Sequence, residues 1–273
     1  MRIDAHQHFW NVERLDYPIL RGSALYRTVE PDALEPLLAP SGMDATIAVQ
    51  AMDDCEETEY LLELADRWTW IAGVVGWVDL ERPLEAGRQL ERFAKHPKFV
   101  GVRHLIMTEP DPDWLIRPAV LEGLRVLSSF GKAFDVGAEF PRHLRHVPAA
   151  AEAAPELRFV IDHLAKPPIG TDGMVAWEAE LERAAACPNV YAKLSGLPAD
   201  GRTQAAVNAA FRCFGADRLL FGSDWPVSAL HSSYERTVEA IRWAASAAGC
   251  TAEGEFAIFG GTARAVYRLE GQP

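Results

Sequence analysis

The sequence has few cysteines, and no two of them are close together. Four occur in 273 residues, Cys55, Cys187, Cys213 and Cys250, and none forms a CxxC pair. Such isolated cysteines are typical of buried or incidental thiols in a reducing compartment. We therefore expect a cytoplasmic protein without disulfides.

The chain also lacks a long apolar run and an excess of basic residues. No apolar stretch is long enough to span a bilayer, and the polar motif that begins at His6 leaves no place for a signal peptide. The formal net charge is −12, from 27 Lys and Arg against 39 Asp and Glu. This acidity argues against nucleic acid or an anionic membrane as a partner. We expect a small-molecule ligand, and the oligomeric state stays open.

No linker, low-complexity tract or sequence repeat divides the chain, so we expect one domain over residues 1–273. Eight short apolar strand patterns alternate with helical patterns. The strand candidates are Arg2–His6, Ala45–Gln50, Ile71–Val78, Phe99–His104, Ala133–Gly137, Leu157–His163, Val190–Ser195 and Leu219–Asp224. This alternation predicts an α/β fold, a single (β/α)8 TIM barrel. A doubly wound open sheet fits less well, because no GxGxxG loop follows the first strand.

The helical patterns carry apolar stripes, and two begin with a proline. Pro83 and Pro118 suit the first turn of a helix, and Gly131 suits the position after the last turn. The predicted helices are Glu56–Arg67, a helix opened by Pro83, Ala119–Phe130, Pro141–Ala154, Gly173–Ala186, Arg202–Phe214 and Ser232–Ala248.

The first strand ends in a His-x-His motif, formed by His6 and His8. Residues two apart in an extended chain point to the same side, so both imidazoles face the same space. In a barrel the eighth strand closes against the first, which places Asp224 beside them. A carboxylate next to two imidazoles can ligate a metal, accept a proton from water, or do both.

Other predicted strand ends carry further functional groups, and the C-terminal ends of barrel strands form the active-site face. The remaining candidates are Gln50, Trp77, Asp79, Arg103, His104, His163, Lys166, Lys193, Ser195 and Trp225. Taken singly, Asp79 and Ser195 are better explained as capping or core polar groups. His163 is a candidate third nitrogen near the metal position, or a donor to a substrate oxygen.

Arg103 and His104 are neighbours on one strand, so only one of them should face the barrel centre. We expect His104 to do so, because it is nearer the loop. Lys193 could polarise a carbonyl group or bind hydroxyl groups. The predicted substrate-binding residues are Gln50, Arg103, His104, Lys166, Lys193 and Trp225.

Four motifs in the right order resemble the amidohydrolase superfamily, in its amidohydrolase-2 branch of lactonases. They are the HxH motif, DHLAKP from Asp162, YAKLSG from Tyr191 and FGSDWP from Phe221. The similarity is strongest to sugar-lactone hydrolases of the L-fuconolactonase and L-rhamnonolactonase type. Weaker matches, such as GVRH from Gly101 and GTARAVY from Gly261, extend the resemblance over essentially the whole chain.

The resemblance implies hydrolysis of the lactone of a sugar acid, with Asp224 or His163 as the general base. It also implies at most one divalent ion, held by His6, His8 and Asp224, since no lysine ends the fourth strand where binuclear members carry a carboxylated one. Zinc suits these ligands better than manganese. Some lactonases of this branch work without metal, so metal-independent activity stays open.

Two other functions are considered. The same branch includes metal-dependent decarboxylases of aromatic carboxylic acids, and Trp10, Trp77 and Trp225 could hold a planar ring. The charged and polar strand-end residues favour a polyhydroxylated substrate instead. A non-catalytic barrel that binds a ligand is the third possibility, but such a protein should have lost the charged groups at its strand ends.

Overall fold

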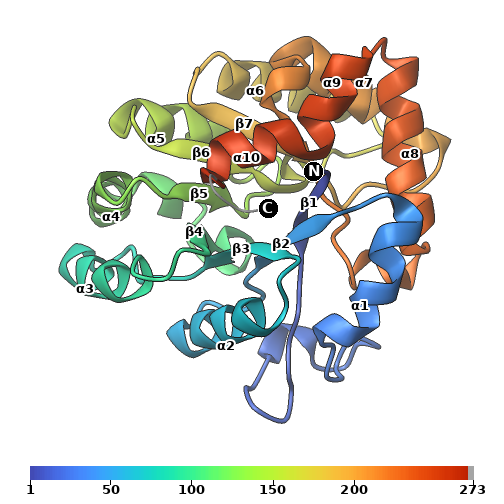
Figure 1. Ribbon diagram of the computed structural model, residues 1–273. Helices are drawn as coiled ribbons and strands as arrows, with labels where there is room; N and C mark the ends of the chain where they lie inside the picture. The colour runs from blue at the N-terminus through green and yellow to red at the C-terminus, as the bar shows by residue number, and fades with distance from the viewer. Residues whose placement is uncertain (270–273) are drawn as a thin grey trace.

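The computed structural model describes residues 1–269, which form a (β/α)8 barrel (Figure 1). The eight strands are all parallel and pair in sequence order. They are β1 (Ile3–Gln7), β2 (Ala45–Val49), β3 (Ile71–Gly76), β4 (Phe99–His104), β5 (Ala133–Val136), β6 (Arg158–Ile161), β7 (Val190–Leu194) and β8 (Leu219–Phe221). The sequence therefore predicted the fold and the approximate place of every strand, although several strand ends differ.

The ring closes where β8 meets β1. Gln7 bridges to Trp225, and the backbone N–H groups of His8 and Asp224 donate to the carbonyls of Trp225 and His6, both at 2.8 Å. These bonds place the loop after β8 directly against the HxH motif, as predicted.

Helices surround the strands on the outside of the barrel, and the last of them lies across one end (Figure 1). They are α1 (Pro31–Leu38), α2 (Cys55–Arg67), α3 (Pro83–Phe93), α4 (Pro118–Ser129), α5 (Val147–Ala153), α6 (Met174–Ala185), α7 (Gln204–Phe214), α8 (Tyr234–Ala247), α9 (Ala252–Phe256) and α10 (Thr262–Tyr267). α1 and the short α9 are absent from the predicted set. α1 carries Pro36 inside it, a residue that normally interrupts helices. α5 is shorter than predicted, because its first part is a loop with one 3-10 turn at Leu144–His146.

Small and branched apolar side chains fill the barrel interior toward the N-terminal ends of the strands. Ile3, Ile47 and Val75 are fully buried there, together with Val266 and Tyr267 of α10. α10 thus packs across that end of the barrel, which leaves the opposite end open for a site.

Six strands end one to three residues earlier than the sequence patterns predict, and β6 and β8 are the two where this moves a candidate site residue, His163 or Asp224, well beyond the strand. β6 stops at Ile161 and β8 stops at Phe221, so His163 and Asp224 lie in the following loops. The backbone explains why His163 and Asp224 lie outside these two strands. Residues 163–166 have φ of 51–56° and Asp224 has φ of 58°, and a left-handed backbone cannot continue a strand ladder.

Two sequence-based expectations about the chain's chemistry can be compared with the structure. All four cysteines are free thiols, as expected. Within residues 1–269, no helix has the combination of length and apolar character needed to cross a bilayer.

Candidate active site

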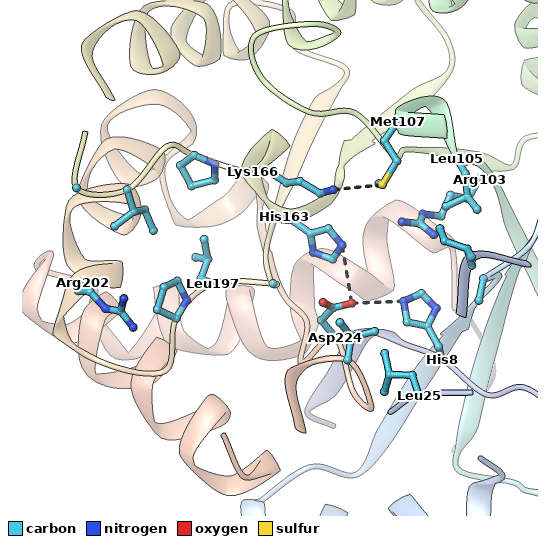
Figure 2. A pocket seen from close by; sticks show the side chains of 18 of the residues that line it. His8, Leu25, Arg103, Leu105, Met107, His163, Lys166, Leu197, Arg202 and Asp224 are labelled. Atoms are coloured by element: carbon cyan, nitrogen blue, oxygen red, sulfur yellow. Dashed lines mark hydrogen bonds and ion pairs between the residues drawn. The ribbon is translucent and has the colours of Figure 1, made fainter. Parts of the chain in front are cut away.

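A cavity of about 1140 Å³ opens at the C-terminal ends of the strands (Figure 2). Its floor includes His8 after β1, Arg103 of β4, His163 after β6 and Asp224 after β8. The loops after β1, β6 and β7 form its walls. Figure 2 shows His8 and His163 on either side of the Asp224 carboxylate.

His6, His8 and Asp224 converge on one point. The two Nε2 atoms are 3.2 Å apart, and Oδ1 of Asp224 lies 3.4 Å from Nε2 of His8 and 3.7 Å from Nε2 of His6. These three side chains therefore form one of two groups in the described chain whose ligand atoms lie close enough to hold a metal ion. The predicted meeting of the HxH motif with Asp224 is confirmed.

His8 has a fixed orientation. Its Nδ1 lies 2.8 Å from the carbonyl oxygen of Val49, which can only accept, so we assign the ring hydrogen to Nδ1. The lone pair is then on Nε2 and faces His6 and Asp224. This is the tautomer that a metal ligand needs.

Asp224 is ionised at neutral pH because of its surroundings. Burial alone would raise its pKa, but the neighbouring His163, the hydrogen bond with His8 and the proximity of His6 hold the pKa below its usual range. Gly222 permits this close approach, since a Cβ atom there would lie 2.5 Å from Cβ of His6. The floor thus presents a carboxylate base among imidazoles.

His163 reaches the floor from a left-handed turn. Such a backbone costs about 1–2 kcal/mol per residue for residues other than glycine, and here backbone carbonyls of the turn are held by hydrogen bonds. Nε1 of Trp177 donates to the carbonyl of Leu164, and the N–H of Phe140 donates to that of Ala165, both at 2.8 Å. The turn directs Nε2 of His163 toward Asp224 Oδ1, 3.8 Å away.

Ser195 and Gly196 hold the His163 ring from the side. Oγ of Ser195 lies 2.8 Å from Nδ1 of His163, and a Cβ atom at Gly196 would lie 2.7 Å from the same nitrogen. Burial lowers the pKa of His163, so the ring is neutral at neutral pH. The sequence interpretation of Ser195 as an ordinary capping or core residue missed this role. Its position two residues after Lys193, on the same side of the strand, was the available signal.

The choice of His104 over Arg103 as the inward residue is wrong. His104 points out of the barrel and stacks on Trp114, with ring centroids 3.9 Å apart and planes at 12°. Its Nδ1 accepts from Nε1 of Trp77 at 3.1 Å and its Nε2 lies 2.8 Å from Glu109. The two tryptophans and Glu109 form a closed slot for this ring, away from the cavity.

Arg103 occupies the inward position instead. Its Nε donates to Asp162 at 2.6 Å and its Nη1 donates to the carbonyl of Gln50 at 3.0 Å. Among the described residues Nη2 has no hydrogen-bond partner, and the side chain lines the cavity. A guanidinium therefore faces the reaction space from the side opposite His163 (Figure 2).

Lys193 does not reach the cavity, contrary to prediction. It is fully buried beneath His6, where its Nζ bonds Asp135 and lies 3.1 Å from Oδ1 of Asp162 and 3.0 Å from Nδ1 of His6. A buried ammonium needs such partners, because removing a charge from water is costly. Tyr267 of α10 completes this layer by bonding Asp135 from below, at 2.8 Å.

Asp135 and Asp162 were not predicted to belong to the site. Each carries a signal in the sequence: Asp135 interrupts the apolar strand Ala133–Val136, and Asp162 directly precedes His163. A charged residue inside a buried strand is almost always paired. That rule, applied to Asp135 and Lys193 together, would have indicated a buried ion pair rather than a substrate contact.

Of the other three predicted substrate-binding residues, only Lys166 lines the cavity. Lys166 lies 3.6 Å from Glu139. Gln50 is fully buried, and its Nε2 donates to Asp53 and to the carbonyl of Arg103. Trp225 packs behind the floor against Phe9, with ring centroids 6.1 Å apart. Neither Gln50 nor Trp225 lies on the cavity wall.

The donor set fits a zinc ion. Two ligands bound at 2.0–2.1 Å with a tetrahedral angle between them are about 3.3 Å apart, and the two Nε2 atoms are 3.2 Å apart. The distances from Oδ1 of Asp224 to these two nitrogen atoms, 3.7 and 3.4 Å, are only slightly longer. Two imidazoles and one carboxylate are also ligands that zinc commonly has at catalytic sites.

The chain is similar to known proteins along nearly its whole length. The L-fucono-1,5-lactonase of Burkholderia ambifaria is 39% identical over 280 residues, which cover 98% of this chain and 96% of that protein. Crystal structures of an amidohydrolase from Burkholderia multivorans are 35% identical and cover 98% of this chain and 99% of theirs. One, with bound HEPES, has a TM-score of 0.90, and one, with bound zinc, has a TM-score of 0.89.

The family model described as amidohydrolase matches residues 3–269, the whole of the barrel from β1 to the end of α10. The HxH motif, the histidine after β6 and the aspartate after β8 lie within this match and meet on one floor. The chain therefore belongs to the amidohydrolase family.

Proposed function

We propose that this protein hydrolyses the lactone of a sugar acid to the free acid. The observation that carries the proposal is the ionised Asp224 among His6, His8 and His163 on the floor of an open cavity. A relative that is 39% identical along nearly its whole length and is named L-fucono-1,5-lactonase supports the choice of substrate class.

Opening a cyclic ester with water requires two proton movements. One proton leaves the attacking water, and one reaches the ring oxygen as the C–O bond breaks. The lowered pKa leaves Asp224 as a free carboxylate when the substrate binds, so it is available to accept the first proton. The carboxylic acid then returns this proton to the departing oxygen, which leaves the enzyme unchanged.

Negative charge builds on the carbonyl oxygen during the attack and needs donors close to it. Arg103 offers Nη2 from one side of the floor, and His163 faces it from the other. If Ser195 donates to Nδ1 of His163, Nε2 carries the hydrogen and donates into the cavity. We assign His163 this donor role and Asp224 the role of base.

A single divalent ion would be held by His6, His8 and Asp224, and zinc is the ion we propose. When bound, such an ion polarises an ester carbonyl or a water molecule. We expect no more than one tightly bound ion per chain when the purified protein is analysed for metals. Two ions would contradict the proposed site.

The cavity wall narrows the substrate class. The sequence predicted many hydroxyl-binding groups, but three of the predicted residues, Gln50, His104 and Lys193, are turned away from the cavity. Much of the wall is apolar, and it includes Trp10, Leu20, Leu25, Met107, Ile169 and Leu197. Such a wall suits the C–H face of a sugar ring, or a deoxy sugar with a methyl group. We propose that polar recognition comes from Arg103 and Lys166.

The direct test is a panel of aldono-lactones and aromatic carboxylic acids, followed with a pH indicator at defined metal content. We expect acid release from the sugar lactones and no change in the carboxylic acids. Consumption of a carboxylic acid without lactone hydrolysis would select the decarboxylase instead. If the parent protein converts neither class of compound, and Asp224→Asn gives the same background rate, the protein is a non-catalytic barrel.

A further inference from the structure

The interior layer beneath the floor contains an unusual neighbour for a metal ligand. Lys193 is fully buried, and its Nζ lies 3.0 Å from Nδ1 of His6, the nitrogen on the far side of the ring from His8. The more common neighbour of this nitrogen in a metal site is an acceptor, which takes the N–H hydrogen and leaves the other nitrogen free for the metal. An ammonium group can only donate.

The hydrogen bonds of the floor close completely without a metal ion. Lys193 donates to Nδ1 of His6, which puts the ring hydrogen on Nε2 of His6. This N–H points at Nε2 of His8, 3.2 Å away, and His8 in turn donates from Nδ1 to the carbonyl of Val49 at 2.8 Å. Every donor in this chain of four groups has an acceptor.

The same group of residues also allows the other tautomer of His6, which metal binding requires. Oδ1 of Asp162 is buried and accepts no hydrogen bond within the described chain, but it lies 3.2 Å from Nδ1 of His6 and 3.1 Å from Nζ of Lys193. When the His6 hydrogen sits on Nδ1, a small rotation of the ring or the carboxylate lets this oxygen accept it, and Nε2 becomes a ligand. One N–H bond is lost at Nε2 and one is gained at Nδ1, so the charge of the ring does not change.

We propose that Lys193 is a positioning residue that weakens metal binding by holding His6 in its metal-free tautomer, in competition with Asp162. The fixed positive charge of Lys193 beside His6 acts in the same direction, because it repels a second cation. The site can therefore keep its geometry with or without a metal. The inference rests on the proposed metal ligands but not on the proposed substrate.

A charge-balanced pair of variants tests this. Lys193→Met alone would leave the Asp135 carboxylate with the Tyr267 hydroxyl as its only partner and no cation, whereas Asp162 would keep Arg103. Lys193→Met is therefore combined with Asp135→Asn, so that one charge of each sign is removed. Asp135→Asn alone is the matched control, since it keeps Lys193 and loses the same carboxylate. Folding of both variants is checked by circular dichroism and thermal unfolding.

The measurement is the zinc Kd of the metal-stripped proteins, by competition with a chromophoric chelator. We expect the double variant to bind zinc at least about tenfold more tightly than Asp135→Asn, within the 10–100-fold range of changes around metal ligands. The increase in Tm that zinc causes should likewise be larger for the double variant than for Asp135→Asn. A purely structural role for Lys193 predicts weaker binding instead.

An equal or weaker zinc affinity in the folded double variant would overturn the proposal, and so would the absence of zinc binding in all forms. The result is independent of lactone hydrolysis. Tighter zinc binding in a protein that hydrolyses no lactone would support the role of Lys193 and contradict the proposed substrate.

Discussion

Two histidines at strand ends, His163 after β6 and His104 at the end of β4, look alike in the sequence but have opposite surroundings. His163 faces Asp224 across an open cavity and is held through Nδ1 by Ser195. His104 faces away from the cavity, stacked on Trp114 and bonded at both nitrogens.

The difference shows that a position at a strand end does not by itself make a residue part of a site. In β4 the side chains alternate, and the barrel interior takes Arg103 because Asp162 is there to pair with it. After β6 the left-handed turn, rather than strand alternation, decides where His163 points. Backbone geometry and available partners therefore separate the reactive histidine from the structural one.

The largest effect should come from a change at Asp224, the proposed base that His163 faces and His104 does not. Asp224→Asn keeps the shape but cannot accept a proton, so turnover of the sugar lactone should fall at least ~10²-fold. Turnover and metal content are measured on the same folded sample. Turnover within a few-fold of the parent, at unchanged metal content, would transfer the role of base to His163.

His163 comes next. His163→Gln removes the ring that faces Asp224 and the donor proposed for the carbonyl oxygen, so kcat should fall at least about tenfold, with Tm nearly unchanged. Ser195→Ala is the companion variant and should lower kcat less, because it removes only the group that orients the ring. A loss in Tm without a loss in kcat would place His163 with His104 as a structural residue.

His104 should show the reverse pattern. His104→Leu removes a stacked ring and leaves Nε1 of Trp77 without an acceptor, so the free energy of unfolding should fall by ~2 kcal/mol. Once the variant is folded, kcat/KM should stay within about threefold of the parent. Denaturant unfolding and initial rates measure the two effects. A large loss of kcat/KM in a stable variant would return His104 to the site.

Arg202, at the far end of the cavity, should have the smallest effect. Its side chain is 72% exposed and pairs with Asp200 at 2.7 Å, and exposed pairs of this kind contribute about 0–1 kcal/mol. Arg202→Ala should therefore change kcat/KM for sugar lactones by less than about threefold. Arg103→Gln is the variant to compare with it, because Arg103 lies in the cavity floor. A larger effect at Arg202 than at Arg103 would mean that the substrate binds at the outer end.

The sequence by itself determined the barrel and the core of the site. Period-two and continuous apolar patterns locate strands, and the closure of β8 on β1 brings Asp224 to His6 and His8. These features depend on local chain geometry and on the order of elements, which a sequence shows directly.

Only the tertiary structure decided which polar side chains face the cavity and which support it from beneath. Lys193 and Arg103 are both cations in buried strands, yet one is covered by His6 and the other reaches the reaction space. Their places depend on Asp135, Asp162 and Tyr267, which come from β5, the end of β6 and α10. Pairing between such distant segments follows from packing in three dimensions, because a buried charge lies where its partners are.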